Sequence, residues 1–235
     1  MTSTVHNLLD SLLNIFYPLS CSGCNTPGST LCDVCIETFR RVDEETTCPI
    51  CGRPIGKSVV CGSCLAEKRT FHRGHFGFYF EGRLRDVIHA FKFSGRRDAG
   101  RALVGLIGKK LDTMAENIDC IVPLPVTARR LWERGFNQSF IIGEEIATLT
   151  GKQIYHSVLV KTKKTKDQYL LSRKERKQNV RGVFTVKDSD KIKGKRVLLV
   201  DDLFTTGYTA QEASRSLLRA SAKQVTFFAL ARTPS

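Results

Sequence analysis

Eight cysteines near the N-terminus are spaced as metal-binding thiolates are. They form four Cys-x-x-Cys pairs, namely Cys21/Cys24, Cys32/Cys35, Cys48/Cys51 and Cys61/Cys64. Two thiolates separated by two residues can both reach one Zn²⁺ from a tight turn, at about 2.3 Å, and Gly23 and Gly52 supply the permissive backbone that such turns need. Four pairs fill two four-ligand sites, so the sequence predicts two structural zinc ions and no hydrolytic zinc with an open position.

The spacing fits two groupings of these pairs. In the sequential grouping the first pair shares a site with the second, and the third with the fourth; in the crossed grouping the first joins the third. Disulfides are a competing interpretation, but a chain with no recognisable export signal is expected in a reducing cytoplasm. An iron–sulfur cluster would call for other spacings. The ninth cysteine, Cys120, lies in an apolar run and is expected to be a buried core thiol.

A second group of residues that could take part in chemistry follows directly after a strongly apolar segment. The segment 197–209 reads VLLVDDLFTTGYT, in which Asp201 and Asp202 follow a predicted strand and precede a predicted helix. Two adjacent carboxylates can accept hydrogen bonds from vicinal hydroxyls. Exposed N–H groups and the dipole at a helix N-terminus favour a phosphate dianion. Sugar hydroxyls beside a phosphate describe ribose 5-phosphate. A response-regulator-like acidic pocket is the alternative, but it would not need the TTGxT loop.

Positive charge is the third chemical feature. The chain has 37 Lys and Arg against 23 Asp and Glu, a net charge of +14. The stretch 152–196 holds 15 of the basic residues and only four acidic ones. Such a stretch attracts polyanions, of which nucleic acid is the usual one; a solvated surface and a loop for a phosphorylated small molecule are the alternatives. The side chains expected to hold a single DNA strand are Lys161, Lys163, Lys164, Lys166, Tyr169, Arg173, Lys174, Arg176, Lys177 and Arg181.

Strands that alternate with helices must position these groups. Apolar runs predict two short strands within 74–80 and further strands at 120–122, 196–200 and 224–231. Helical periodicity predicts helices at 83–93, 99–114, 140–149 and 209–220. This alternation predicts a parallel sheet with helices on both faces, whose ligands bind beyond the carboxyl ends of the strands.

The chain divides into three predicted parts: an amphipathic helix at 1–18, a zinc module at 19–68 and the α/β domain at 69–235. The apolar side chains of the first part share one helical face and Pro18 ends the helix. That face is expected to pack on the protein's own body, with membrane association as the alternative. No apolar stretch approaches the roughly 18 residues of a membrane span, so we predict a cytoplasmic protein with no integral membrane segment.

Several segments together resemble a known family. The segment 197–209 fits, at all thirteen positions, the phosphoribosyl pyrophosphate signature of type I phosphoribosyltransferases. The segments 89–95 (HAFKFSG), 122–138 (VPLPVTARRLWERGFNQ) and 165–184 (TKDQYLLSRKERKQNVRGVF), with the four Cys-x-x-Cys pairs, resemble the ComF family of competence-associated, phosphoribosyltransferase-like proteins with an N-terminal double zinc ribbon. The resemblance covers almost the whole chain.

The resemblance implies a type I phosphoribosyltransferase fold and a role for each segment. Asp201 and Asp202 would hold the ribose hydroxyls. The 5-phosphate would be held by Thr205, Thr206, Gly207, Tyr208 and Thr209. The loop 123–137 would hold pyrophosphate with Mg²⁺, and the segment 161–181, with Gln168, Ser172 and Asn179, would form a lid. The pyrophosphate and lid candidates are Lys92, Arg129, Arg130, Arg134, Arg173 and Arg176. Asn137 and Gln138 are candidates for binding phosphate or for capping the following helix, and one of them is expected to be the cap.

One departure from related enzymes bears on the chemistry. Purine-salvage phosphoribosyltransferases carry an acidic general base where this chain has Thr205, which puts transfer to a hypoxanthine-like base in doubt. The resemblance therefore predicts a protein that binds phosphoribosyl pyrophosphate with Mg²⁺ and acts in DNA uptake, in contact with single-stranded DNA and other DNA-uptake proteins. The alternative is a phosphoribosyltransferase acting on a small-molecule acceptor, with no nucleic-acid role.

Overall fold

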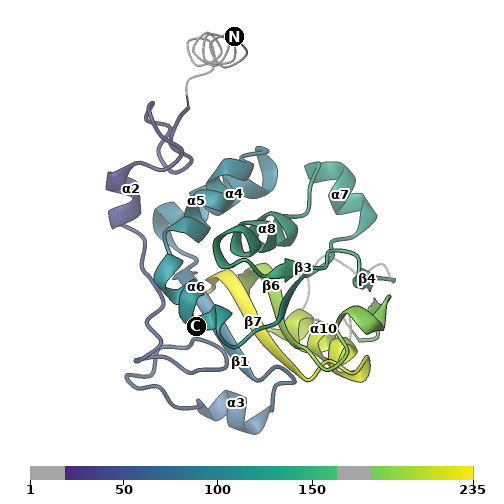
Figure 1. Cartoon of the computed structure of the whole chain (residues 1–235). Coiled ribbons are helices and arrows are strands. Elements are labelled where there is room, and N and C mark those ends of the chain that lie inside the picture. The colour runs from purple at the N-terminus through teal and green to yellow at the C-terminus, as the bar shows by residue number, and fades with distance from the viewer. Residues whose placement is uncertain (1–18, 163–180, 235) are drawn as a thin grey trace.

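A five-stranded, wholly parallel sheet forms the centre of the molecule (Figure 1). The computed structural model describes residues 19–162 and 181–234. The sheet order is β1-β7-β6-β2-β3. The strands are β1 Arg73–Tyr79, β2 Cys120–Pro123, β3 Gln153–Ile154, β6 Arg196–Phe204 and β7 Gln224–Arg232. The predicted parallel sheet is confirmed.

The two central strands read as continuous apolar runs because both of their faces are covered. In β6, Val200 pairs with Phe228 of β7 and with Pro123 of β2. The carboxyl ends of β2 and β6 therefore meet at one edge of the sheet. That edge receives the two carboxylates of β6 and the loop that follows β2.

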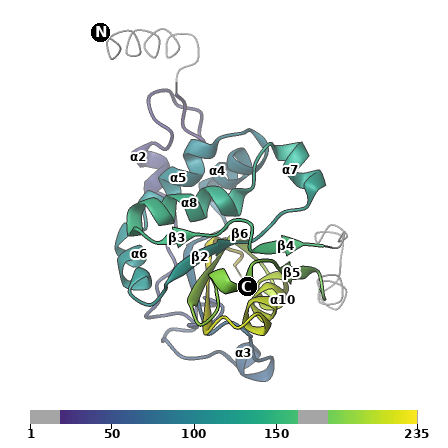
Figure 2. The same cartoon turned by 45° about the vertical axis from the view of Figure 1, so that its right-hand side comes forward.

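Helices cover the two faces of the sheet in separate layers. One face is covered by α4 Gly82–Phe93, α5 Arg97–Gly105, α6 Gly108–Ala115 and α8 Gln138–Thr150. The other face is covered by α10 Tyr208–Arg219 and by an antiparallel pair, β4 Leu159–Lys161 and β5 Phe184–Val186. Figure 2 shows this pair beside α10, where Ser216 Oγ donates to the carbonyl of Phe184 at 3.1 Å.

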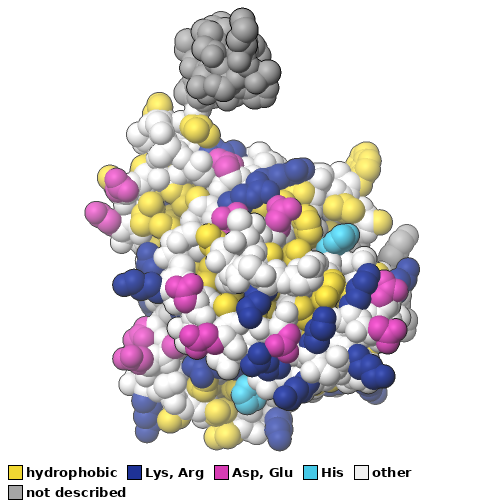
Figure 3. Space-filling view, viewed as in Figure 1, with side chains coloured by type: hydrophobic (Ala, Val, Ile, Leu, Met, Phe, Trp, Pro, Cys, Tyr) yellow, Lys and Arg dark blue, Asp and Glu magenta, His cyan; other side chains and the backbone are white. Residues whose placement is uncertain are grey.

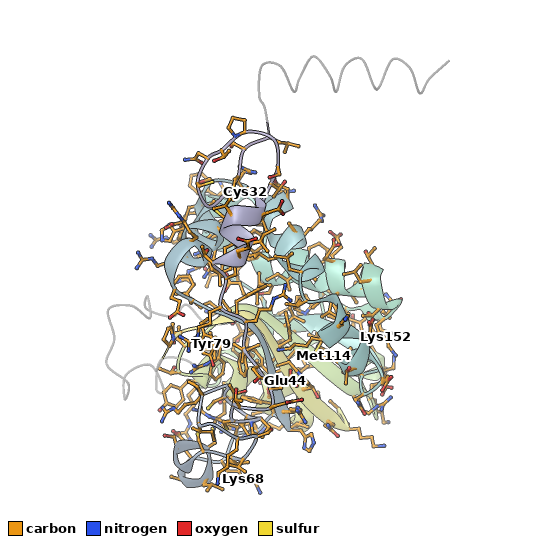
Figure 4. The ribbon with its side chains drawn as sticks, turned by 90° about the vertical axis from the view of Figure 1, so that its left-hand side faces the viewer. Cys32, Glu44, Lys68, Tyr79, Met114 and Lys152 are labelled. Atoms are coloured by element: carbon orange, nitrogen blue, oxygen red, sulfur yellow. The ribbon has the colours of Figure 1, made fainter. Side chains whose placement is uncertain are left out.

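The two cysteine clusters lie on opposite faces of the same sheet. The first carries α2 Asp33–Glu37, and its Cys21 and Cys35 are buried with α4 and α5. The second carries α3 Gly62–Ala66, and all four of its cysteines are buried with the α10 layer. Figure 4 shows Cys32 and Lys68 at opposite ends of the molecule with Glu44 between them.

The connection between the clusters runs along the β1 edge of the sheet. The Val42 amide donates to the Gly77 carbonyl at 3.0 Å. Glu44 then lies 2.9 Å from His75 Nδ1 and 3.2 Å from Arg73 NH2, with Lys110 Nζ at 3.4 Å. Burial alone would raise the pKa of Glu44, but the hydrogen bond with His75 and the neighbouring cations lower it to about 2. This ion cluster fixes the connection to the sheet.

Some predicted elements differ from the observed ones. One strand, β1, replaces the two short strands expected within 74–80, because the run is continuous and pairs along its length with β7. The helix expected at 99–114 is interrupted at Leu106 and Ile107 and forms α5 and α6. The loop 123–137 contains a short helix, α7 Ala128–Arg134, which the sequence interpretation missed along with β3, β4 and β5. The amphipathic helix expected at 1–18 lies outside the described residues.

Across residues 19–162 and 181–234, we find no helix with both the length and the apolar character needed to cross a bilayer.

Candidate functional site

A cavity of about 360 Å³ opens at the carboxyl ends of β2 and β6. Its walls come from α4, from the β2–α7 loop with α7, from the start of α8, and from the β6–α10 loop. This is the edge at which ligands bind in parallel α/β sheets, and its volume lies in the range of small-molecule sites. The groups that line it determine what it can bind.

Two carboxylates lie side by side on the floor of this cavity, and a lysine faces them. Asp202 Oδ2 lies 3.0 Å from Lys92 Nζ, and both side chains are largely buried. Asp201 Oδ1 accepts hydrogen bonds from Ser139 Oγ at 3.1 Å and from the Asp202 amide at 2.8 Å. Burial, and then the charge of Asp202, raise the pKa of Asp201 to about 7. The pair thus combines an ion-paired carboxylate with one that gains or loses a proton near neutral pH.

The β6–α10 loop presents a helix N-terminus to the same cavity. Gly207 is the N-cap of α10, with φ of 77°, and no side chain caps the helix. A Cβ at this position would lie 2.6 Å from the Phe204 ring, so only glycine fits the turn. Thr205, Gly207 and Thr209 line the cavity. The first N–H groups of α10 are therefore placed to bind an anion.

Two residues of the predicted phosphate loop do not line the cavity. Thr206 and Tyr208 are absent from its walls, and the Tyr208 ring is buried. The Tyr208 hydroxyl donates to Glu67 Oε2 at 3.3 Å, on the side of the second cysteine cluster. The structure thus gives Tyr208 a packing role behind the loop.

Cations from α4 and α7 form the opposite wall. Of the predicted residues, Lys92, Arg130 and Arg134 line the cavity, whereas Arg129 does not. Arg129 is exposed and pairs with Glu133 at 2.7 Å, one helical turn away. Arg173 and Arg176 lie outside the described residues. The wall that faces the carboxylates is thus basic, as a pyrophosphate requires.

The start of α8 adds a polar group that the sequence interpretation left open between phosphate binding and helix capping. Asn137 caps α8 by accepting from the Ser139 amide at 3.0 Å, which confirms the predicted capping role. Gln138 lines the cavity, is only 1% exposed and accepts from Arg134 NH1 at 3.1 Å. Its Nε2 has no hydrogen-bond partner in the described part of the chain. A buried donor without a partner is costly, so Gln138 is suited to bind a ligand oxygen. Its position in the RGFNQ motif was the available signal.

The cysteines form two four-sulfur clusters. Their members are Cys21, Cys24, Cys32 and Cys35 in the first and Cys48, Cys51, Cys61 and Cys64 in the second. The sulfurs of each cluster lie within 4.8 Å of one another, and the sulfurs of Cys24 and Cys32, like those of Cys51 and Cys61, are 3.6 Å apart. Tetrahedral zinc needs sulfurs about 3.8 Å apart. The donor set and spacing therefore fit zinc, and the sequential grouping is the observed one.

The structure also tests the disulfide interpretation and the prediction for Cys120. All nine cysteines are free thiols, so the disulfide interpretation is wrong. Cys120 is fully buried, which confirms the expected core thiol, and burial raises its pKa to about 11.

A second cavity, of about 730 Å³, separates the second cysteine cluster from the end of α10. Four basic residues line it: Lys68, Arg69, His72 and Lys223. Among the described residues, no Asp or Glu contributes to its wall. Leu65, which also lines this cavity, is 70% exposed. Figure 3 shows many Lys and Arg side chains over the lower right of the molecule, with Asp and Glu side chains among them. We call this cavity the basic groove.

Two family models match the chain. Residues 12–65 match the double zinc ribbon domain, and residues 99–235 match the phosphoribosyl transferase domain. With the parallel sheet and the two four-cysteine clusters, these matches define a protein of the type I phosphoribosyltransferase fold that carries a double zinc ribbon.

Sequence relatives identify the family within this fold class. The DNA utilization protein YhgH of Escherichia coli is 32% identical over 86% of this chain and 90% of its own length. Competence protein F of Haemophilus influenzae is 29% identical (73% and 78% covered), and competence protein ComFC of Bacillus subtilis is 25% identical (88% and 86% covered). The chain belongs to the ComF family.

Solved structures give weaker matches. Adenine phosphoribosyltransferase from Leishmania tarentolae aligns with a TM-score of 0.38 at 17% identity, over 61% of this chain and 74% of that one. The Trypanosoma brucei enzyme aligns with a TM-score of 0.35 at 14% identity, over 61% and 68%. The type I phosphoribosyltransferase fold is shown by the family model over residues 99–235 and by the parallel sheet itself.

Proposed function

We propose that the protein binds 5-phosphoribosyl pyrophosphate together with Mg²⁺. The observation that carries this proposal is the presence, in one cavity, of the paired carboxylates Asp201 and Asp202, an uncapped helix N-terminus and a basic wall. Hydroxyl acceptors, a phosphate site and pyrophosphate donors are the three requirements of this ligand.

In this proposal, each wall of the cavity binds a different part of the ligand. Asp201 and Asp202 accept hydrogen bonds from the ribose hydroxyls, and the 205–209 loop binds the 5-phosphate through the amides of α10. The pyrophosphate lies toward Arg130, Arg134 and Gln138. Mg²⁺ would be held together with the pyrophosphate, whose oxygens are the hard ligands that this cation prefers, and would add positive charge beside Arg130 and Arg134. The ion pair between Lys92 and Asp202 supports a role for the Lys92 charge beside the bound ligand.

The phosphoribosyl proposal is tested by calorimetry with phosphoribosyl pyrophosphate and MgCl₂. Replacing both carboxylates, Asp201→Asn and Asp202→Asn, removes the negative charges and turns one acceptor oxygen of each side chain into a donor with little change in volume, so affinity should fall by more than about tenfold. The exposed Asp188→Asn is the matched control and should bind as the wild type does. Equal affinity in the double variant and the control would remove the carboxylates from the site.

We also propose that the protein handles single-stranded DNA during DNA uptake. The names of the relatives, DNA utilization protein and competence protein, favour this role. So does the basic stretch 152–196, most of whose central part lies outside the described residues. Within the described residues, the basic groove offers Lys68, Arg69 and Lys223, and a groove of positive charge is what tracks the backbone of a single strand without sequence preference. An enzyme acting on a small-molecule acceptor would need only the phosphoribosyl cavity.

The DNA proposal is tested by fluorescence anisotropy with a 30-mer across a salt series. Each neutralised phosphate contributes about −0.7 to the slope of log affinity against log salt, so about five contacts give a slope near −3 to −4. The double variant Lys68→Ala, Lys223→Ala should flatten this slope. Lys109→Ala, an exposed lysine on α6 away from the groove, should not. A wild-type slope near zero would leave a small-molecule enzyme.

A further inference from the structure

The chain that leaves the second zinc ribbon runs against the first turns of α10, directly behind the phosphate loop. Three residues make this contact in sequence. Glu67 accepts from the Tyr208 hydroxyl at 3.3 Å, Arg69 NH1 donates to Gln211 Oε1 at 2.9 Å, and Thr70 Oγ1 donates to the Gln211 carbonyl at 2.6 Å. Glu67 follows the last zinc ligand, Cys64, by only three residues. The ribbon and the loop are thus joined without an intervening element.

Arg69 lies closest to the loop itself. Its NH1 is 3.5 Å from the point where a Cβ on Gly207 would stand, and its guanidinium lies over the Tyr208 ring at 5.6 Å from the centroid. Arg69 does not line the phosphoribosyl cavity. Its positive charge therefore lies behind Gly207, on the far side of the loop from the ligand.

This arginine lacks a counter-ion in the described part of the chain. Its hydrogen-bond acceptor is the neutral amide of Gln211, and its Nε is buried without a partner. A cation at a helix N-terminus is also opposed by the helix dipole. Both effects are unfavourable in the free protein. A dianion bound by the first amides of α10 would relieve both.

We propose that Arg69 belongs to the 5-phosphate site as an electrostatic positioning residue, and that the second zinc ribbon delivers it there. The inference rests on the proposed binding of a phosphoribosyl ligand. Arg69 acts through the loop: its charge raises the potential at the Gly207 and Tyr208 amides, and its bond to Gln211 holds the first turn of α10 in place. The double zinc ribbon thereby takes part in ligand recognition, although no cysteine faces the cavity.

The experiment compares two probes on the same proteins by calorimetry. Ribose 5-phosphate reports on the phosphate loop, and inorganic pyrophosphate with MgCl₂ reports on the Arg130 side. Arg69→Gln should weaken ribose 5-phosphate about tenfold and change pyrophosphate by no more than about twofold. Arg69→Lys, which keeps the charge, should recover most of the loss. Arg83→Gln is the matched control, since Arg83 joins the other zinc ribbon to α4 through the Gly23 carbonyl.

Two further measurements separate charge from anchoring. The second pKa of a phosphate monoester is near 6, and a cation favours the dianion, so wild-type affinity for ribose 5-phosphate should rise from pH 5 to pH 7.5 more steeply than that of R69Q. Thr70→Val removes the neighbouring bond to Gln211 and leaves the charge in place. It should bind as the wild type does.

The results distinguish a failure of the Arg69 assignment from a failure of the proposed function. Unchanged ribose 5-phosphate affinity in R69Q, or an equal loss in R69Q and Thr70→Val, overturns the assignment of Arg69 while the cavity still binds its ligand. A wild type that binds no phosphoribosyl ligand overturns the proposed function as well. If R69Q melts far below the wild type, R69K decides: wild-type affinity supports the electrostatic role, and a tenfold loss contradicts it.

Discussion

The two zinc ribbons share one ligand pattern and differ in what they pack against. The first lies on α4 and α5, where Arg83 NH1 donates to the Gly23 carbonyl at 3.2 Å and Thr30 Oγ1 donates to Asp98 Oδ2 at 2.9 Å. The second lies on β1 and α10 at the opposite face of the sheet, where the Gly74 amide donates to the Pro49 carbonyl at 2.9 Å. Two copies of one motif are thus anchored on the two different layers that enclose the ligand cavity.

The difference lies in how directly each ribbon reaches that cavity. The first ribbon contacts α4, and α4 carries Lys92 to Asp202 near its far end. The second ribbon contacts the phosphate loop itself, through Glu67 and Arg69. Its cysteines are all buried, whereas Cys24 and Cys32 of the first ribbon are partly exposed. The second ribbon should therefore be the more strongly coupled to the ligand.

The largest effect is expected from removing one zinc site at a time. Cys48→Ser with Cys51→Ser should lower ribose 5-phosphate affinity by more than about tenfold, because the segment that holds the phosphate loop loses its fold. Cys21→Ser with Cys24→Ser should lower it by about threefold or less. Elemental analysis should find about one zinc ion in each variant and about two in the wild type. An equal loss of ribose 5-phosphate affinity in the two variants would contradict the stronger coupling of the second ribbon to the ligand.

A smaller effect is expected at the end of α4, through Lys92. Lys92→Met removes the cation that counters the raised pKa of Asp201, so this carboxylate should hold its proton to higher pH. An ionised carboxylate is the better acceptor for ribose hydroxyls. Ribose 5-phosphate affinity should therefore fall severalfold at pH 7 and recover toward pH 9. Calorimetry at a series of pH values measures the midpoint, which should lie above that of the wild type; an unshifted midpoint would separate Lys92 from Asp201.

The smallest effect on the ligand is expected from the connection between the ribbons. Glu44→Gln leaves the largely buried Lys110 and His75 without their carboxylate and should destabilise the protein by about 1–3 kcal/mol. Ligand affinity should stay within about twofold, because Glu44 lies far along the sheet from the cavity. Chemical denaturation and calorimetry on the same preparation test both statements. A large loss of affinity would mean that the connection couples the ribbons.

Most of the candidate site could be predicted from the sequence because its residues lie close together along the chain. Asp201, Asp202 and Gly207 fall in one contiguous strand–loop–helix unit, so their mutual arrangement follows from residue spacing alone. The sequential zinc grouping is local for the same reason, although spacing alone did not decide it. The side-chain direction of Tyr208 is not local. It follows from a hydroxyl partner 141 residues earlier in the chain.

The contacts between different layers of the fold could not be predicted from the sequence. The pairing of Lys92 with Asp202 joins residues more than a hundred positions apart, and nothing in HAFKFSG indicates which partner the lysine takes. The choice of a sheet face by each ribbon depends on how the segment around Glu44 passes the β1 edge, and such a path leaves no periodic signal. Short strands such as β3 are likewise defined by their neighbours rather than by their own residues.

The position of β1 has a consequence for dissecting the chain. This strand lies at residues 73–79, before the 99–235 segment that matches the phosphoribosyl transferase domain, yet it pairs along its length with β7. A fragment that begins at residue 99 would leave the β7 edge unpaired, uncover the buried Phe227 and Phe228, and lose α4. An open apolar edge of this kind templates strand addition between molecules. We expect such a fragment to aggregate, so the smallest folding unit of this protein begins well upstream of the segment that sequence comparison marks out.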